Sequence, residues 1–226
     1  MTVQVLSRSK YPSGRTFWVS WLYKAMRSPF VVKWLFGMKV LSEKELQICF
    51  PQYDLPAIYF TITTILLKGL LKEKLKRSPN LTLLEIGTGP FAILSGCLSR
   101  WTTQTIDATD IDPAFVASAQ KHVELNKVNV RLFQSDLFDN VPTGKKYDVI
   151  FWNPPTELDA NIYLPRLFET VPDFLNEGGQ LIIVYNHKRL APEIPLKTLS
   201  KYNRLQLRKL KTWWWNIHDA LLIDKN

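Results

Sequence analysis

Short apolar runs alternate with longer helical patterns from about Leu81 onward, and this alternation constrains the fold more than any other feature of the chain. Strands are expected at residues 82–86, 105–111, 128–133, 147–152 and 180–185, with a final strand pair at 205–211 and 217–223. Helices are expected at 91–98, 113–126, 162–175 and 191–201, and Gly178-Gly179 is expected to end the third of these. The pattern predicts an α/β fold with seven strands in a mostly parallel sheet and helices on both faces.

A glycine turn, Glu85-Ile86-Gly87-Thr88-Gly89, follows the first expected strand and precedes a helix. Glycine lets the backbone turn tightly and approach a ligand without a clash from a Cβ atom, so this turn can hold an adenosine-containing cofactor. A dinucleotide site would use a similar turn. The third glycine of that fingerprint is absent, however, because the chain continues Pro90-Phe91-Ala92, and Pro90 is expected to open a helix.

Acidic residues follow the next two expected strands. Asp110 ends the second strand, where a carboxylate can accept hydrogen bonds from both hydroxyls of a ribose. Its neighbour Asp112 is expected to be the N-cap of the helix that Pro113 opens. Asp136 can accept from an adenine amino group, with Leu137 against the ring, and an ordinary loop carboxylate is the alternative. Ligands of parallel sheets bind outside the carboxyl ends of the strands, so these residues are expected to share one site.

The fourth expected strand ends in the corner Asn153-Pro154-Pro155. Prolines hold such a corner stiffly and remove competing donors. The Asn153 side-chain oxygen and the Pro154 carbonyl can then accept the two N–H groups of an amide or amine. A simple strand-ending turn is the alternative for this motif.

These motifs together resemble the class I S-adenosylmethionine-dependent methyltransferases over about residues 50–226. The resemblance rests on the segments 85–89, 108–113, 135–138 and 153–155. Within that superfamily the chain is most similar to the branch with an Asn-Pro-Pro-aromatic motif, which methylates protein glutamine amides and exocyclic amines of RNA or DNA bases. The resemblance implies a Rossmann-like sheet and S-adenosyl-L-methionine as the cofactor.

The resemblance also implies roles for the matching residues, with the glycine turn at the methionine part, Asp110 at the ribose and Asp136 near adenine. The implied cofactor-binding residues are Glu85, Gly87, Thr88, Gly89, Asp110, Ile111, Asp136, Leu137 and Asn153. The implied catalytic residues are Asn153 and Pro154, which hold the acceptor nitrogen.

Methyl transfer to such a nitrogen depends mainly on alignment. The sulfonium methyl is already electrophilic, so the enzyme has to place a nitrogen lone pair in line with the methyl–sulfur bond. An amide or aniline-like nitrogen is a poor nucleophile because its lone pair is delocalised, and two acceptors on its N–H groups can orient it. No metal is required, in keeping with the scattered positions of His122, His187 and His218, which are expected to be surface or structural residues.

Thr156 stands where the family usually has an aromatic residue that stacks on a planar acceptor. Trp152, or an aromatic residue from positions 17–36, is the candidate for a replacement stacking face. Two alternatives to an RNA or protein N-methyltransferase therefore remain open. One is a methyltransferase for small molecules or peptide natural products, and the other is a cofactor-binding partner protein without catalysis.

The net charge of +9 is unevenly spread. Residues 1–45 hold eight Lys/Arg against two acids, and residues 187–211 hold eight against one. Such basic flanks can mark a surface for RNA, for a protein substrate or for anionic lipid, and solvated surface charge is the alternative. Residues 1–49 are expected to form an aromatic-rich helical extension, either a cap on residues 50–226, a substrate-recognition element or a membrane-surface helix. A further helix is expected at 56–74, beside the glycine turn.

The remaining features favour a cytoplasmic protein. Cys49 and Cys97 look like isolated thiols of a reducing compartment. No signal-peptide pattern opens the chain, and the longest uncharged apolar stretch, 55–67, is too short to span a bilayer. Trp213-Trp214-Trp215 is expected to contribute at least one core side chain, and the oligomeric state is not indicated by the sequence.

Overall fold

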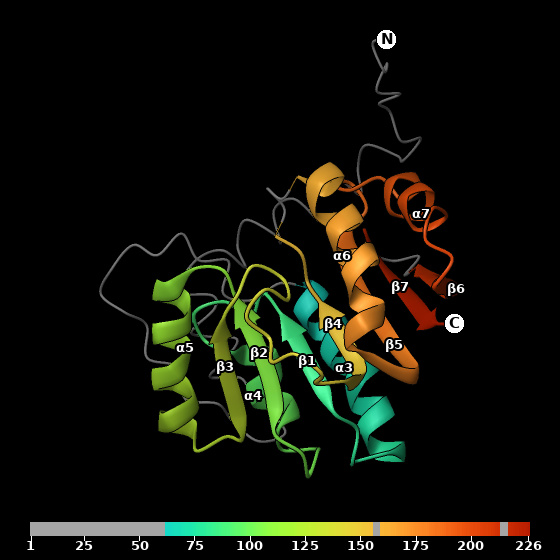
Figure 1. Cartoon of the computed structure of the whole chain (residues 1–226). Coiled ribbons are helices and arrows are strands. Elements are labelled where there is room, and N and C mark those ends of the chain that lie inside the picture. Colours follow the sequence, from blue (N-terminus) through green and yellow to red (C-terminus); the bar gives the residue numbers. More distant parts are fainter. Residues whose placement is uncertain (1–61, 156–158, 213–216) are drawn as a thin grey trace.

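The computed structural model describes residues 62–155, 159–212 and 217–226 (Figure 1). The expectations for the aromatic-rich extension, for Thr156 and for the tryptophan run lie outside these ranges. Within them, no helix is both long enough and apolar enough to cross a membrane.

The seven strands form one sheet in the order β3-β2-β1-β4-β5-β7-β6. They are β1 (Leu83–Ile86), β2 (Ile106–Asp110), β3 (Val130–Gln134), β4 (Tyr147–Trp152), β5 (Leu175–Asn186), β6 (Leu205–Thr212) and β7 (His218–Lys225). The first five strands run parallel to one another, whereas β7 is antiparallel to both β5 and β6. The prediction of a seven-stranded, mostly parallel sheet is confirmed.

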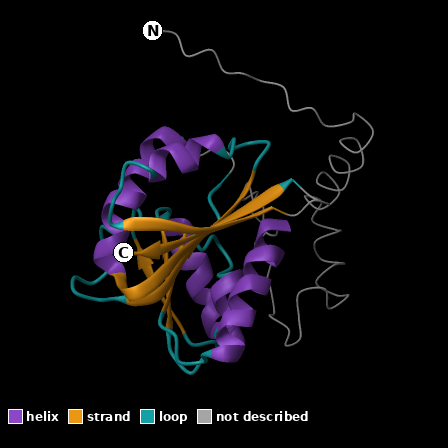
Figure 2. Cartoon of the chain, turned by 90° about the vertical axis from the view of Figure 1, so that its right-hand side faces the viewer, coloured by secondary structure: helices purple, strands orange, loops and turns teal. Residues whose placement is uncertain are grey.

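Helices cover both faces of the sheet, as the edge-on view of Figure 2 shows. The helices are α3 (Ile62–Arg77), α4 (Ile93–Leu98), α5 (Pro113–Asn126), α6 (Ala160–Phe174) and α7 (Glu193–Leu199). Apolar residues of α3, α4 and α5 share one buried cluster with one face, and those of α6 and α7 share a second cluster with the other. Two hydrophobic cores therefore fix the sheet between its helical layers.

Local signals set several helix starts. The Asp112 side chain accepts a hydrogen bond from the Ala114 amide at 2.8 Å, which confirms this residue as the N-cap of α5. The Asp159 side chain caps α6 in the same way through the Asn161 amide. The expectation for Pro90 is wrong, because α4 begins at Ile93 and Pro90 lies in the turn before it.

The expectation that Gly178 and Gly179 end a helix is also wrong, because both lie inside β5. The pairing of β4 with β5 shifts register, from Tyr147 opposite Leu175 to Val149 opposite Gln180. The intervening residues of β5 therefore form a bulge. A Cβ atom on Gly179 would lie 2.8 Å from the Asn176 carbonyl oxygen and 3.0 Å from that of Tyr147, so close backbone approach explains this glycine.

Candidate active site

The register of the central strands brings three of the expected site residues to one edge of the sheet. Ile86 of β1 lies opposite Thr109 of β2 on one side and opposite Trp152 of β4 on the other. The next residues along these strands are Gly87, Asp110 and Asn153. These three residues therefore lie at adjacent positions on the carboxyl edge of the sheet, although they are far apart in the chain.

The glycine turn has the backbone geometry that only glycine adopts easily. Gly87 and Gly89 have φ values of +67° and +68°. The Thr88 amide between them donates to the Thr109 carbonyl at 2.8 Å, which ties the turn to β2. A Cβ atom on Gly87 would lie 3.5 Å from the indole nitrogen of Trp152, so this tryptophan packs against the turn.

Trp152 itself is only 2% exposed and belongs to the core under α6. The expectation that its ring could supply a stacking face for the acceptor is therefore wrong. Ile111, by contrast, is 55% exposed beside Asp110 at the same edge. An exposed apolar side chain there suits its expected place against the cofactor.

Asp110 connects the glycine turn with the start of α5. Its Oδ2 accepts from the Gly89 amide at 2.8 Å, and its Oδ1 accepts from the Asp112 amide at 3.0 Å. Burial raises the pKa of this carboxyl, and the two amide bonds oppose that rise. Each carboxylate oxygen carries two lone pairs, so both oxygens can still accept from a ribose hydroxyl.

Glu85 lies directly under the glycine turn and is 4% exposed. Its Oε2 accepts from the Thr88 hydroxyl and from the Ser95 amide of α4, both at 3.0 Å. Burial raises its pKa to about 7. Ser95 is a site residue that the sequence reasoning missed, because nothing in the helical pattern marks its amide as a partner of Glu85.

Asp136 and Leu137 lie just after β3, as expected. The Arg166 guanidinium of α6 donates to Asp136 Oδ2 at 2.8 Å and lies 3.8 Å from Asp139. Leu137 has a φ of +51° and is buried in the core under α6. The contact with adenine stays a prediction for both residues, and one oxygen of Asp136 already has a protein partner.

Asn153 is half-buried, and its side-chain nitrogen donates to the Thr64 hydroxyl of α3 at 3.5 Å. Its side-chain oxygen accepts no hydrogen bond from the described residues, so it is the atom that can accept one from a substrate. Thr64 was missed as a site residue. The sequence indicated only that a helix at 56–74 lies beside the glycine turn. Within the described residues α3 confirms this helix.

The histidines lie outside this constellation. The His122 ring bonds the Ser118 carbonyl within α5, and His187 pairs with Asp219 at 3.2 Å. His218 is 1% exposed, and burial together with the neighbouring His187 lowers its pKa to about 4. Among the described residues no group of three or more His, Cys, Asp or Glu side chains is arranged to hold a metal ion.

Solved methyltransferases share this fold, a mostly parallel sheet in this strand order whose β7 is antiparallel to its neighbours. A methyltransferase from Pyrococcus furiosus superposes with a TM-score of 0.64 at 24% identity, covering 94% of this chain and 96% of that one. A Thermus thermophilus 16S rRNA N2 G1207 methyltransferase, solved with AdoMet and guanosine, gives 0.61 at 22% identity, covering 75% and 44%. These likenesses establish the fold.

The chain belongs to the methyltransferase small domain family, whose model matches residues 62–210. A release factor glutamine methyltransferase from Rhodopirellula baltica is 32% identical over 161 residues, which cover 59% of this chain and 53% of that protein. This chain matches only part of the length of its curated relatives. The matched part covers 66%, 67% and 53% of three of them. The predicted membership of the class I methyltransferases is confirmed.

Proposed function

We propose that this chain is an S-adenosylmethionine-dependent methyltransferase that methylates an amide or amino nitrogen of RNA or of a protein side chain. The observation that carries the proposal is the register that brings Gly87, Asp110 and Asn153 level at one edge of the sheet. Family membership supports it, and the named relatives act on a glutamine of a release factor and on N2 of a guanosine in 16S rRNA. Both acceptors are planar groups with two N–H bonds.

The cofactor supplies an electrophilic methyl group when it is bound. Asp110 holds the ribose hydroxyls, and the turn over Glu85 accommodates the methionine part. The Asn153 side-chain oxygen and the Pro154 carbonyl accept the two N–H groups of the acceptor and orient its lone pair. The bond from Asn153 to Thr64 fixes which end of the side-chain amide faces the acceptor.

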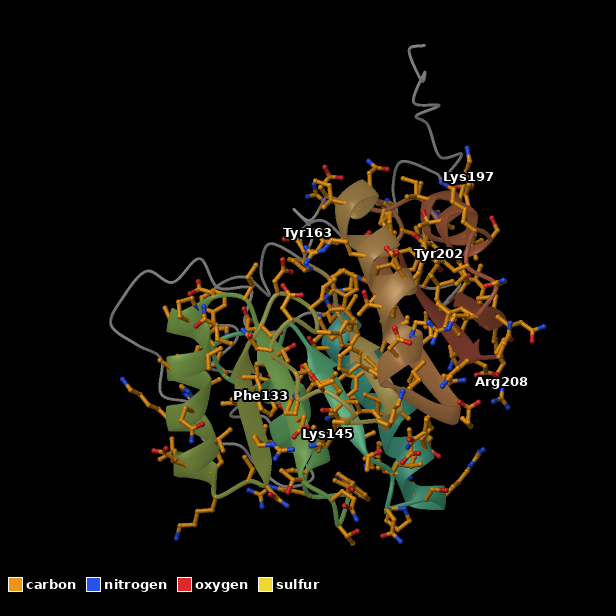
Figure 3. All side chains as sticks on the ribbon, in the orientation of Figure 1. Phe133, Lys145, Tyr163, Lys197, Tyr202 and Arg208 are labelled. Carbon is orange, nitrogen blue, oxygen red and sulfur yellow. The ribbon has the colours of Figure 1, made fainter. Side chains whose placement is uncertain are left out.

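The proposal also assigns the two parts of the chain. Residues 50–226 form the methyltransferase domain. Residues 1–49 form an extension that recognises the substrate together with the basic segment at residues 187–211. Two residues of this basic segment, Lys197 of α7 and Arg208 of β6, lie on the side of the molecule that these two elements form (Figure 3). A cytoplasmic location is part of the proposal, and the free thiol of Cys97 is compatible with it.

The test is transfer of a labelled methyl group from S-adenosylmethionine to a fractionated cell extract, followed by nuclease or protease digestion. Asn153→Ala is expected to abolish transfer and to leave cofactor binding nearly intact, because the acceptor loses its aligning contact whereas the cofactor keeps the glycine turn and Asp110. The matched control is Asn161→Ala, an exposed asparagine in the first turn of α6, which is expected to leave transfer unchanged. Undiminished transfer by Asn153→Ala would remove Asn153 from the reaction, and no transfer by the wild type would remove the proposed activity.

A further inference from the structure

Trp152 is a buried tryptophan whose ring nitrogen lies beside the glycine turn. The side chain is 2% exposed, and a Cβ atom on Gly87 would lie 3.5 Å from its Nε1 atom. This nitrogen donates no hydrogen bond to any residue that the structure describes. A buried tryptophan N–H usually has a partner, and a buried donor without one is costly. The Trp152 N–H is therefore the candidate donor for a ligand seated on the turn.

The position of Trp152 places this donor between the glycine turn and the Asn153 corner. Trp152 ends β4, lies opposite Ile86 of β1 and directly precedes Asn153. Gly87 follows Ile86, and its φ of +67° favours glycine over other residues. Because glycine has no Cβ atom, no side chain from position 87 covers the indole nitrogen.

The backbone of the turn has few donors left for a ligand. The Thr88 amide donates to the Thr109 carbonyl and the Gly89 amide donates to Asp110, both at 2.8 Å. Pro90 has no N–H group. An anionic group that binds at this turn therefore needs a donor from another segment of the chain.

We propose that Trp152 binds the cofactor by donating its indole N–H to the carboxylate of the methionine part. This inference rests on the proposed function, which places the methionine part at the glycine turn. Of the amino-acid groups in that part, the ammonium group is a donor and the carboxylate is the acceptor. Glu85 and Asp110, the charged side chains bonded to the turn, are acids that can face the ammonium group but not the carboxylate. An uncharged donor such as the indole suits the carboxylate.

The experiment compares S-adenosylhomocysteine with S-adenosyl-3-thiopropylamine, which lacks only the carboxylate, by isothermal titration calorimetry. The wild type is expected to bind S-adenosylhomocysteine at least tenfold more tightly, as expected for a hydrogen bond to a charged group. Trp152→Phe keeps an aromatic ring and removes the donor. This variant is expected to lose about tenfold in affinity for S-adenosylhomocysteine and to bind the analogue as the wild type does.

The matched control is Trp101→Phe. Trp101 is a half-buried tryptophan that precedes β2 at the opposite, amino edge of the sheet, with the Lys72 ammonium 4.2 Å from its ring centroid. The same substitution there is expected to leave both affinities at their wild-type values, because neither ligand reaches that edge.

The outcomes separate the two proposals. Unchanged affinity in Trp152→Phe, or equal losses for the two ligands, would overturn the role of Trp152 and leave the methyltransferase proposal standing. Equal affinities of the wild type for both ligands would overturn that role as well. Absence of S-adenosylhomocysteine binding by the wild type would overturn both proposals.

A crystal structure of the wild type with S-adenosylhomocysteine decides the question if Trp152→Phe fails to fold. The ligand carboxylate is expected within about 3.2 Å of the Trp152 ring nitrogen. A carboxylate held elsewhere would overturn the inference.

Discussion

Asp110 shows how single contacts organise the candidate site. Each of its carboxylate oxygens accepts one hydrogen bond from a backbone amide, that of Gly89 on one oxygen and that of Asp112 on the other. The same side chain thus holds the glycine turn in place and presents oxygens at the edge where a ribose would lie. Asp110 thus has an observed structural role beside its proposed binding role, and a substitution has to separate the two.

Asp110→Ala is expected to weaken S-adenosylmethionine binding at least tenfold, because hydrogen bonds to an ionised group contribute about 1.5–3 kcal/mol each. Asp112→Ala is the matched control, since the loss of an N-cap lowers the free energy of unfolding by about 1 kcal/mol, whereas the backbone amide of residue 112 can still donate to Asp110. Calorimetric affinity and chemical denaturation measure the two effects. Unchanged affinity in Asp110→Ala would show that this acid does not hold the cofactor.

Glu85 is expected to make stability depend on pH. Its pKa is raised from 4.5 to about 7 in the folded chain, so the folded state holds a proton that the unfolded state releases. The stabilisation is full below pH 4.5, falls as the pH rises toward 7 and is absent above it, a change on the order of 3 kcal/mol. Burial raises the pKa of Asp110 too, which adds a fall in the same direction.

Urea denaturation at pH 5 and pH 8 tests this expectation. The wild type is expected to be less stable at pH 8, and Glu85→Gln is expected to lose most of the difference, because an amide does not titrate. An equal pH dependence in the wild type and in Glu85→Gln would show that the buried carboxyl does not titrate in this range.

At the scale of elements, the sequence predicts best those helices and strands whose bounds are set by neighbouring residues. The helix at 113–126 and the strand at 147–152 match α5 and β4 residue for residue. Asp112 and Pro113 mark the start of the helix locally, and an uninterrupted apolar run marks the strand. The acid after β2 and the corner after β4 could be placed for the same reason, since they end strands of one parallel sheet.

The features that the sequence did not predict depend on contacts between distant segments. The bulge in β5 depends on the pairing of this strand with β4. The local sequence around Gly178 and Gly179 does not contain that pairing, and by itself it is typical of the end of a helix. The hydrogen bond from Asn153 to Thr64 joins residues 89 positions apart, and that from Arg166 to Asp136 joins residues 30 positions apart. No local pattern encodes such partners.

Two glycine substitutions are expected to have opposite effects on stability. Gly179→Ala places a Cβ atom within 2.8–3.1 Å of three backbone atoms in the bulge, so we expect a loss of roughly 1–3 kcal/mol. Gly69→Ala places one in open space on α3, where alanine is favoured over glycine by about 0.5–1 kcal/mol. Denaturation midpoints measure both changes. A stabilising Gly179→Ala would contradict the close approach seen in the bulge.

At the scale of the whole molecule, positive charge lies beside the candidate site. Lys188 and Arg189 are exposed in the turn that follows β5, at the same carboxyl edge of the sheet as Asn153. Their segment, residues 187–211, holds eight Lys/Arg against one acid. Positive charge at this edge would suit the polyanionic substrate that we propose as one of the two acceptor classes.

If the acceptor is RNA, its affinity is expected to fall steeply with salt, roughly hundredfold between 50 and 200 mM for about four phosphate contacts. Replacing Lys188 and Arg189 together by alanine is expected to weaken RNA binding and flatten this dependence. The control replaces the exposed Lys121 and Lys127 of α5 and its C-cap, which changes the net charge equally at the far side of the sheet. Equal effects of the two double variants, measured by fluorescence anisotropy, would argue for a diffuse charge effect instead of a surface at the rim.

A crystal structure of the protein with bound S-adenosylhomocysteine would test the assignment of the whole edge at once. We predict the ligand over the Gly87–Gly89 turn, with its ribose hydroxyls on Asp110 and its sulfur facing the corner formed by Asn153 and Pro154. A ligand bound elsewhere, or an Asn153 side chain directed away from the sulfur, would contradict the proposed methyl transfer.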